Sequence, residues 1–319
     1  MTFHMRAVVV REYGGRAEIV ALPAPEVEPG HILIKIAAAG MNPMDRSIAG
    51  GVWKSVMAAT FPMILGFDVA GIVGDIGEGT TRFGVGESVI GQLLLPPVGA
   101  FGTYAEYVAV SEQATLTRIP SGVDPAVAAA APTAGMSGLA IVDSLSPLDK
   151  KTVLIVGAAG GVGSFATQLA AIAGAKVIAN VRQENVPRMQ TYGVAETVDH
   201  TAAPLAELVA RTHPDGIDVL IDAANDADDF AALAALVRQG GSALTTRYVA
   251  DVDALAAKGV TAINFQLPAS SELLERIAEA LAAKTVIPPP IKLVSLVNAP
   301  AAFNGEGEPV FDGKTVIVV

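Results

Sequence analysis

The sequence predicts an α/β protein with two domains, a partly open β-barrel and a doubly wound parallel sheet. The stretch TVLIVGAAGGVGSFATQLAAIAGAKVIAN at 152–180 has the pattern of a strand, a glycine turn, a helix and a second strand. From residue 152 to 265, strand-like and helical segments alternate, as they do in doubly wound sheets. Before residue 122, short strand-like runs are separated by glycine and proline turns, a texture typical of a barrel.

The barrel domain is expected to contain the following strands: 6–11, 32–37, 69–76, 88–95 and 104–110. The sequence pattern changes near 120–124. After this point a single alanine-rich helix is predicted over 125–144. The closing strand 314–319 resembles the first segment more than the middle of the chain. We therefore expect the tail to return to the barrel domain.

The second domain is expected to alternate between strands and helices. Its predicted strands are 153–156, 176–179, 195–198, 217–223, 242–246 and 260–265, and its predicted helices include 205–211 and 230–237. Ser271 is expected to cap a further helix over 272–284, which the prolines of 288–290 end. The predicted boundaries are 1–122 and 266–319 for the barrel domain and 123–265 for the parallel-sheet domain.

Composition excludes several classes of function. The chain has 319 residues, a net charge of −11 and no cysteine. Without cysteine there are no disulfides, thiol nucleophiles, iron–sulfur clusters or thiolate zinc sites. No basic stretch concentrates the 21 Lys and Arg residues, which argues against nucleic-acid and membrane partners. The start lacks the apolar run of a signal peptide, so a cytoplasmic location is predicted.

The uncharged interval 152–175 is long enough to suggest a membrane span. Its glycine cluster and its division into strand and helix favour a soluble interpretation instead.

The glycine turn predicts a dinucleotide site. Gly157 would turn the chain sharply out of the strand, Gly160 would let backbone approach a pyrophosphate, and Gly163 would let the helix pack closely. The N-terminus of that helix offers N–H groups to phosphate. An ordinary tight turn is the alternative. The predicted contacts are Gly157, Ala158, Ala159, Gly160, Gly161, Val162 and Gly163.

The end of the second strand favours NADPH over NADH. Sites that prefer NAD usually place an acid there, whereas Asn180, Val181 and Arg182 follow here. Arg182, with Arg188 as a second candidate, would pair with a 2′-phosphate. Glu184 is expected to face water at the start of a helix. The alternative is that Arg182 is a solvated surface charge.

The chain resembles the zinc-independent, quinone oxidoreductase-like branch of the medium-chain dehydrogenase/reductase superfamily. The resemblance runs from end to end and rests on four motifs together with the closing GKTVIVV: GMNPMD at 40–45, PMILGFDVAGIV at 62–73, GTYAEYVAV at 102–110 and VLIVGAAGGVG at 153–163. In metal-dependent relatives a Cys stands in place of Asn42, and Gly-His-Glu stands where this chain has Gly66, Phe67 and Asp68. The four-cysteine structural zinc lobe has no counterpart either, so no metal site is predicted.

The resemblance implies a GroES-like barrel domain and a Rossmann domain. It also implies zinc-independent transfer of hydride from NADPH to a quinone or to an α,β-unsaturated carbonyl, which need positioning and hydrogen bonds to the oxygen but no Lewis acid. It further implies a homodimer formed through the dinucleotide domain, with 260–265 as a possible edge strand.

The resemblance also suggests catalytic residues. Asn42 matches an Asn of the cleft and would orient the substrate or the nicotinamide ribose, although it is alternatively a turn residue before Pro43. Ser47 stands where relatives often have Tyr, which weakens any proton-donor assignment there. Tyr104 is a candidate proton donor, with packing inside its strand as the alternative. Asp45 is expected to brace the loop, with acid–base work as the alternative.

The resemblance also points to further candidate contacts. Trp53, Phe67, Phe101 and Phe265 would form an apolar wall for a flat ring, and each is alternatively a core residue. The resemblance implies cofactor contacts outside the glycine turn as well. They are Asn42, Thr133 and Ser137 in PTAGMSG, Asn180, Val181, Arg182, His200 near the adenosine, the small strand-end residues Ala223, Ala224 and Thr245, and Phe265. The Lys that relatives carry in the second helix is Val186 here, so the NADP preference rests on Arg182.

Two other functions stay open at this point. One is a non-catalytic dinucleotide-binding protein that acts as a redox sensor or structural component on the same fold. The other is an enoyl-thioester reductase, which would require a wider cleft.

Overall fold

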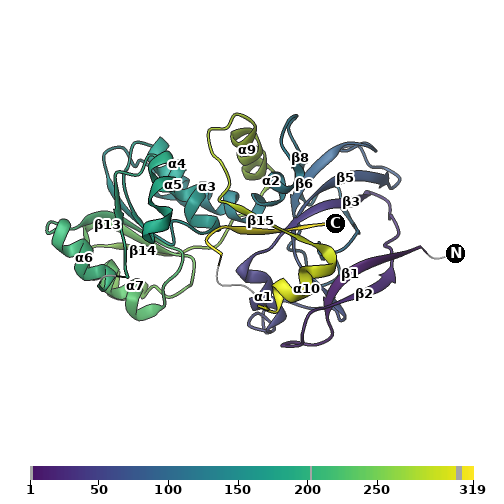
Figure 1. The fold of residues 1–319 in the computed structure, drawn as a ribbon, viewed down its shortest axis with the longest axis horizontal. Helices are drawn as coiled ribbons and strands as arrows, with labels where there is room; N and C mark the ends of the chain where they lie inside the picture. The colour runs from purple at the N-terminus through teal and green to yellow at the C-terminus, as the bar shows by residue number, and fades with distance from the viewer. Residues whose placement is uncertain (1–2, 202, 307–310) are drawn as a thin grey trace. The chain divides into compact units, whose positions relative to one another are not determined.

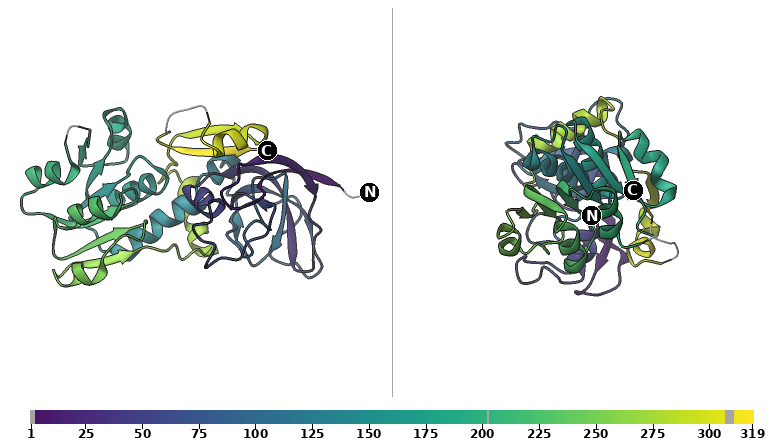
Figure 2. Two further views of the ribbon diagram at one scale, coloured as in Figure 1. Left: turned by 90° about the horizontal axis from the view of Figure 1, so that it is seen from below. Right: turned by 90° about the vertical axis from the view of Figure 1, so that its left-hand side faces the viewer.

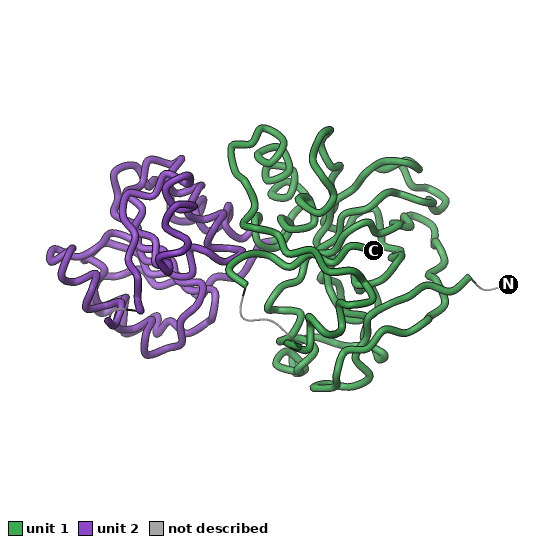
Figure 3. The backbone as a smooth tube through the Cα atoms, viewed as in Figure 1, with its two compact units in different colours: residues 1–136, 269–319 green, residues 137–268 purple. Residues whose placement is uncertain are grey.

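A computed structural model describes residues 3–201, 203–306 and 311–319 (Figure 1). The chain forms two compact units (Figure 3): unit 1 comprises residues 1–136 and 269–319, and unit 2 comprises residues 137–268. The division falls inside helix α3, Pro132–Leu145. Residues 123–136 therefore group with unit 1, beyond the predicted boundary at 122.

Unit 2 contains a six-stranded, fully parallel sheet. Its strands are β9 (Thr152–Val156), β10 (Lys176–Asn180), β11 (Glu196–Val198), β12 (Ile217–Asp222), β13 (Val237–Thr245) and β14 (Thr261–Asn264). Their spatial order is β11-β10-β9-β12-β13-β14, so the winding reverses between β9 and β12. This confirms the predicted doubly wound sheet, and β14 lies at its edge as expected.

Helices cover both faces of this sheet. They are α3, α4 (Gly161–Ile172), α5 (Val186–Thr191), α6 (Leu205–Thr212), α7 (Ala227–Ala234) and α8 (Val252–Ala256), and a 3₁₀ turn, η1 (Gln183–Asn185), precedes α5. The right-hand view of Figure 2 looks onto this unit and shows strands with helices on either side.

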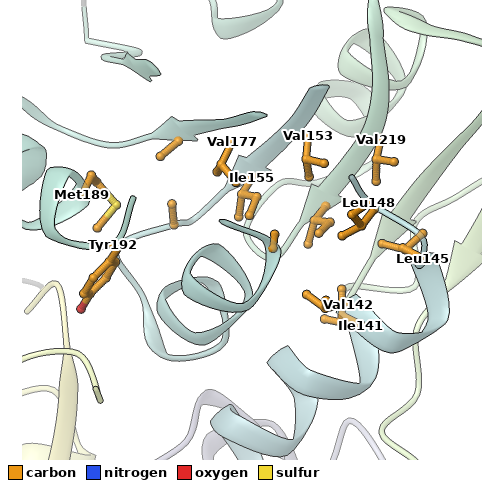
Figure 4. Packing of buried hydrophobic residues seen from close by; sticks show 14 of the residues in the cluster. Ile141, Val142, Leu145, Leu148, Val153, Ile155, Val177, Met189, Tyr192 and Val219 are labelled. Atoms are coloured by element: carbon orange, nitrogen blue, oxygen red, sulfur yellow. The ribbon is translucent and has the colours of Figure 1, made fainter. Parts of the chain in front are cut away.

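Successive residues of β9 point to opposite faces of the sheet. Val153 and Ile155 pack in one apolar cluster with Ile141 of α3 (Figure 4), whereas Leu154 packs in a second cluster with Phe230 of α7. Both faces are buried, which explains why the strand is an unbroken apolar run. The uncharged interval 152–175 thus divides into β9 and α4, as expected. Within the described stretches, no helix is long and apolar enough to span a bilayer.

Two helices differ from their predicted limits. The alanine-rich helix is broken into α2 (Pro125–Ala129) and α3, because Pro132 has no N–H to donate to the preceding turn. Helix α7 begins earlier than predicted because the Asp226 side chain accepts a hydrogen bond from the N–H of Asp229, and it ends before Val237, which opens β13.

Unit 1 is built of two sheets. A seven-stranded sheet has the order β15-β16-β3-β5-β6-β8 with β7 paired to β3, and a three-stranded sheet has the order β2-β1-β4. The strands are β1 (His4–Val10), β2 (Glu18–Pro23), β3 (His31–Gly40), β4 (Met63–Ile64), β5 (Asp68–Ile76), β6 (Ser88–Gln92), β7 (Tyr107–Ser111), β8 (Thr115–Arg118), β15 (Ile291–Ser295) and β16 (Lys314–Val318).

The C-terminal strand β16 pairs antiparallel with β3, so the end of the chain returns to unit 1, as predicted. Strands β2, β4, β8 and β15 were not predicted, and neither was the short helix α1, Pro43–Ala49. The helix α9 (Ser271–Ala282) is capped by Ser270 and not by Ser271, since the Ser270 hydroxyl accepts from the N–H of Leu273. Unit 1 also contains η2 (Leu296–Asn298) and α10 (Ala299–Phe303).

Strand β7 begins three residues later than the predicted start at Tyr104. The Tyr104 N–H donates to the carbonyl of Leu65, and the Tyr104 carbonyl accepts from the N–H of Val8. Its backbone therefore bonds to Val8 of β1 and to Leu65, which follows β4, and not to β3. The Tyr104 side chain is fully buried.

Candidate functional site

The residues predicted to contact a dinucleotide in unit 2 gather at one edge of the parallel sheet. They follow or end its strands: 157–163 after β9, Asn180–Arg182 at β10, His200 after β11, Ala223 and Ala224 after β12, Thr245 at β13 and Phe265 after β14. The carboxyl ends of parallel strands lie at the same edge of a sheet, so the residues that follow these strands lie near one another at that edge. Ser137, buried in α3, is the exception.

The three turn glycines have distinct geometries. Gly157 has a φ of +76°, a conformation that an L side chain rarely adopts. Gly160 is the N-cap of α4 and no side chain caps the helix there, so the first N–H groups of α4 stay available. A Cβ on Gly163 would lie 2.1 Å from the carbonyl oxygen of Gly157. The helix therefore packs directly on the turn.

We expect Gly163→Ala to destabilise this turn. The added methyl meets backbone that has no room to move, so α4 must shift, at a cost of about 1–3 kcal/mol of unfolding free energy. Chemical denaturation measures the loss, and Gly84→Ala is the matched control because nothing lies within 4 Å of a Cβ there. Equal stability of the two variants would contradict the packing argument.

Small residues surround the turn. A Cβ on Gly157 would lie 3.4 Å from the Cβ of Ala224 and 3.7 Å from that of Ala223. Ala223 and Ala224 therefore lie beside the glycine turn, at the place between β9 and β12 where the strand order of the sheet reverses. Larger side chains at these two positions would occupy the space next to the turn. At the next strand end, the N–H of Phe265 donates to the carbonyl of Thr245 over 2.8 Å.

At the end of β10, Asn180 and His200 are joined. The Asn180 Nδ2 lies 3.0 Å from Nδ1 of His200 and donates to the carbonyl of Val198 over 3.2 Å. Arg182 is exposed, and its Nη1 lies 3.9 Å from Oε1 of Glu184. The second candidate, Arg188, lies differently, because its Nη2 donates to the carbonyl of Ala159 over 3.2 Å and to Oδ1 of Asn185 over 2.6 Å. Arg188 braces the glycine turn.

Unit 1 contains a buried cluster of polar side chains that the sequence patterns did not reveal as a unit. We name it the buried polar cluster. Its members are Asn42, Asp45, Asp68, Tyr104, Thr133 and Lys314.

Asn42 lies at the centre of this cluster, as the N-cap of α1. Its Nδ2 donates to Oδ2 of Asp68 over 2.8 Å, and its Oδ1 accepts a hydrogen bond from the ammonium of Lys314. Both ends of the amide are thus engaged within unit 1. The predicted role of Asn42 in orienting a substrate stays a prediction.

Asp68 and Lys314 form a buried ion pair. The Lys314 Nζ lies 3.5 Å from Oδ2 of Asp68, and the two side chains are 4% and 0% exposed. Oδ1 of Asp68 accepts from the hydroxyl of Thr133 over 2.6 Å and from its N–H over 3.1 Å. Burial raises the pKa of Asp68, and the Lys314 ammonium is the strongest influence in the opposite direction.

Asp45 and Tyr104 form a second buried pair in the cluster. Oδ2 of Asp45 accepts from the Tyr104 hydroxyl over 2.6 Å and from the N–H of Asn42 over 2.6 Å. The second of these bonds braces the start of α1, as the sequence predicted for Asp45. Burial raises the pKa of Asp45 from 3.8 to about 7, despite the two hydrogen bonds.

Tyr104 is held firmly in its protonated form. Burial and the neighbouring Asp45 carboxyl raise the pKa of Tyr104 well above 10. A Cβ on Gly66 would lie 2.2 Å from the Tyr104 ring, so this ring packs against the bare backbone of residue 66. To act as a proton donor, as the sequence suggested, Tyr104 would have to break its bond to Asp45.

Asp45 also lines a pocket inside unit 1. The pocket has a cavity volume of about 20 Å³, which is room for about one water molecule. Its remaining lining residues are apolar or glycine: Ile48, Met63, Ile64, Leu65, Gly66, Phe67, Leu93, Leu94, Leu95, Val98, Gly99, Phe101 and Gly102. Two of the predicted substrate-wall residues, Phe67 and Phe101, are therefore in the wall of one pocket.

Two other predicted residues lie outside the set that lines the pocket. Trp53 is partly buried and packs against the apolar cluster that contains Phe67 and Tyr104. The Ser47 hydroxyl donates to the carbonyl of Pro43 over 3.4 Å, within α1.

Sequence reasoning missed Asp68 and Lys314 as site residues. Asp68 stands in the quoted motif PMILGFDVAGIV, at a position where metal-dependent relatives carry an acid, and that was the available signal. Lys314 is 272 residues from Asn42, so no local pattern indicates their contact.

Comparison with known proteins agrees with this architecture. The family model described as "Alcohol dehydrogenase GroES-like domain" matches residues 28–121, and the one described as "Zinc-binding dehydrogenase" matches residues 161–263. In the described residues, no group of three or more His, Asp or Glu side chains is arranged to hold a metal.

Two curated relatives are plant proteins. A chloroplast envelope quinone oxidoreductase homolog of Arabidopsis thaliana is 32% identical over 69% of this chain and 68% of its own length. A chloroplastic NADPH-dependent alkenal/one oxidoreductase of the same plant is 30% identical over 74% of this chain and 61% of its own length. The chain thus matches about two thirds of the length of these relatives.

Solved structures share the whole fold. The quinone oxidoreductase from Coxiella burnetii superposes with a TM-score of 0.86 over 99% of this chain and 100% of its own, at 23% identity. The motifs, the two-unit architecture and the plant relatives agree with the resemblance seen in the sequence. The chain belongs to the medium-chain dehydrogenase/reductase superfamily of oxidoreductases, in its quinone oxidoreductase-like branch.

Proposed function

We propose that this protein is an NADPH-dependent reductase of quinones and α,β-unsaturated carbonyl compounds that works without zinc. The observation that carries the proposal is the glycine turn after β9, where Gly157 has a φ of +76° and no side chain caps the N-terminus of α4. The names of the quinone and alkenal/one oxidoreductase relatives support the acceptor class.

The residues at the edge of the parallel sheet fit a dinucleotide. The uncapped N-terminus of α4 offers N–H groups to a pyrophosphate, and Ala223 and Ala224 leave space beside the turn. Bound NADPH supplies the hydride. The contacts predicted for Thr133, Ser137, Asn180, Val181, His200, Thr245 and Phe265 belong to this proposal.

The buried polar cluster supports a mechanism without metal. In this chain the oxygens of Asn42 and Asp68 already face the ammonium of Lys314. A divalent cation placed beside these oxygens would be repelled by that charge. Quinones and enones are electrophilic without a Lewis acid, so hydrogen bonding and exclusion of water suffice.

Arg182 supports NADPH over NADH. We expect Arg182→Ala to weaken NADPH binding about tenfold to a hundredfold, the range for one charge-assisted hydrogen bond, and to leave NADH binding unchanged. The reverse charge change, Glu184→Gln, should strengthen NADPH binding two- to threefold, because Glu184 competes for Arg182 over 3.9 Å.

Fluorescence titration of each nucleotide measures these changes. Arg211→Ala, which removes an exposed arginine of α6 in the same unit, is the matched control for net charge. Equal losses for NADPH and NADH in Arg182→Ala would remove the basis for the NADPH assignment.

A panel of acceptors tests the reductase itself. The protein is mixed with NADPH or NADH and then with quinones, enals, enones or an enoyl thioester, and oxidation of the nicotinamide is followed by its absorbance. We expect turnover with quinones or enones. Binding of NADPH without turnover of any acceptor would indicate a redox sensor or structural protein, and preference for the thioester would indicate an enoyl reductase.

The assembly and location predicted from the sequence also remain proposals. The edge strand β14 offers unpaired backbone groups through which two copies of unit 2 would form a homodimer. Sedimentation of the purified protein tests this assembly. A cytoplasmic location, small-molecule substrates and the absence of nucleic-acid and membrane partners complete the proposal.

A further inference from the structure

Tyr248 has an unusual backbone conformation, in the loop between β13 and α8. Its φ is +60°, in the left-handed region, where a Cβ crowds the backbone and glycine is the favoured residue. The loop follows the carboxyl end of β13, at the edge of the sheet where the predicted dinucleotide contacts Thr245 and Phe265 lie. Tyr248 is 48% exposed. The conformation therefore costs free energy that deep burial of the ring does not offset.

Among the described residues, two other non-glycines have a positive φ, and each has an ordinary structural reason. Lys284, with a φ of +55°, directly follows the C-cap of α9, where helices commonly end in a left-handed residue. Lys150, with a φ of +60°, is the third residue of the turn 148–151, which a backbone hydrogen bond of 3.0 Å closes. Tyr248 ends no helix, and no backbone hydrogen bond within 246–250 closes a turn there.

Hydrogen bonds hold the loop on both sides of Tyr248. Before it, the N–H of Arg247 donates to the hydroxyl oxygen of Thr245 over 3.0 Å. After it, the side-chain amide of Asn264, the last residue of β14, accepts from the N–H of Ala250 over 3.0 Å and donates to its carbonyl over 3.1 Å. The loop is thus tied to β13 and to β14. A strained residue that its surroundings keep in place is typical of a site that contacts a ligand.

The place of the loop on the sheet indicates which part of a dinucleotide lies near it. A doubly wound sheet binds a dinucleotide across the point where the strand order reverses, with one nucleotide on each half of the sheet. Here that point lies between β9 and β12, and Arg182, the predicted contact of the 2′-phosphate, follows β10. The adenosine end therefore belongs to the half made of β9, β10 and β11. The nicotinamide end belongs to the half made of β12, β13 and β14, in which Tyr248 lies.

We propose that Tyr248 binds the nicotinamide end of the dinucleotide, with its aromatic ring packed against the nicotinamide and its ribose. The inference rests on the proposed function. An aromatic side chain offers a large, flat contact surface to another ring. Because hydrogen bonds already order the loop, little backbone freedom is lost when the ligand binds. The strained conformation of Tyr248 is then part of how the free protein prepares the site.

Three variants separate the ring from the strained backbone. We expect Tyr248→Gly and Tyr248→Ala to weaken NADPH binding about tenfold each, because both lack the ring. Tyr248→Gly should denature at a higher urea concentration than Tyr248→Ala, since glycine adopts a positive φ more readily. Tyr248→Phe keeps the ring and should bind NADPH nearly as tightly as the wild type. A merely structural role would instead make the affinity follow the stability, with Tyr248→Gly binding better than Tyr248→Ala.

A fragment of the ligand identifies the half that Tyr248 contacts. Adenosine 2′,5′-bisphosphate contains the adenosine and the 2′-phosphate of NADPH but neither the nicotinamide nor its ribose. Isothermal titration calorimetry measures the affinity of both ligands, and we expect every Tyr248 variant to bind the fragment as the wild type does. Lys150→Gly is the matched control, because Lys150 has the same φ of +60° but precedes β9, at the opposite edge of the sheet. This control should keep the wild-type affinity for both ligands.

The outcomes separate this inference from the proposed function. NADPH affinity that Tyr248→Gly and Tyr248→Ala leave unchanged, or a loss that extends equally to the fragment, overturns the role of Tyr248 and leaves the reductase standing. A loss confined to NADPH, in a protein that reduces no acceptor, supports the role of Tyr248 and overturns the reductase. A wild type that binds neither ligand overturns both.

Discussion

Replacing Lys314 with Met is expected to lower the free energy of unfolding by about 3–5 kcal/mol. The substitution leaves the Asp68 carboxyl, 0% exposed, without the cation that lies 3.5 Å away. Lys314 is the strongest influence that lowers the pKa of Asp68, so the pKa of Asp68 should rise further in the variant. The penalty should therefore be smaller at low pH, where the carboxyl is neutral, and larger at high pH.

Urea denaturation of four proteins measures this effect: the wild type, Lys314→Met, Asp68→Asn and the double variant. The double variant should recover most of the loss, because it contains neither charge. Lys176→Met, at an exposed position of β10, is the control and should change stability by less than about 0.5 kcal/mol. A Lys314→Met loss as small as that of the control would contradict the buried ion pair.

Asp45→Asn is expected to change how stability depends on pH. In the unfolded chain Asp45 titrates near 3.8, and in the folded protein its pKa is about 7. Between these values the folded state binds one more proton than the unfolded state, so this group makes stability fall as the pH rises. A shift of about three units corresponds to about 4 kcal/mol, most of it lost between pH 4 and pH 7.

The variant lacks this titration. The difference in unfolding free energy between Asp45→Asn and the wild type should therefore shift in favour of the variant from pH 4 to pH 7 and stay constant above pH 8. Denaturation at several pH values measures the difference, and other groups cancel because both proteins contain them. A difference independent of pH would show that Asp45 titrates normally in the folded protein.

The sequence predicted the parts of the fold that depend on local patterns. The β9–α4–β10 unit, the alternation that follows it and the return of β16 to unit 1 are all encoded in apolar periodicity, glycine placement and the closing apolar run. The roles predicted for Gly157 and Gly163 follow from the same local sequence pattern. Gly157 has a positive φ, as a sharp turn requires, and Gly163 packs against the turn.

The parts that escaped prediction depend on contacts between distant segments. Asp45 meets Tyr104 across 59 positions, and Asn42 meets Lys314 across 272. No periodicity indicates which buried polar groups will face each other. The pattern also joined α2 to α3, because alanines on both sides of Pro132 have the same helical preference.

One measurement tests directly whether the proposed reduction works without zinc. The protein is stripped of metals with a chelator, and NADPH oxidation is then followed with tetramethyl-1,4-benzoquinone and with an enal, before and after zinc is added back. We expect turnover that chelation and zinc leave unchanged, with one reduced acceptor formed for each NADPH consumed. Turnover that chelation abolishes and zinc restores would contradict it.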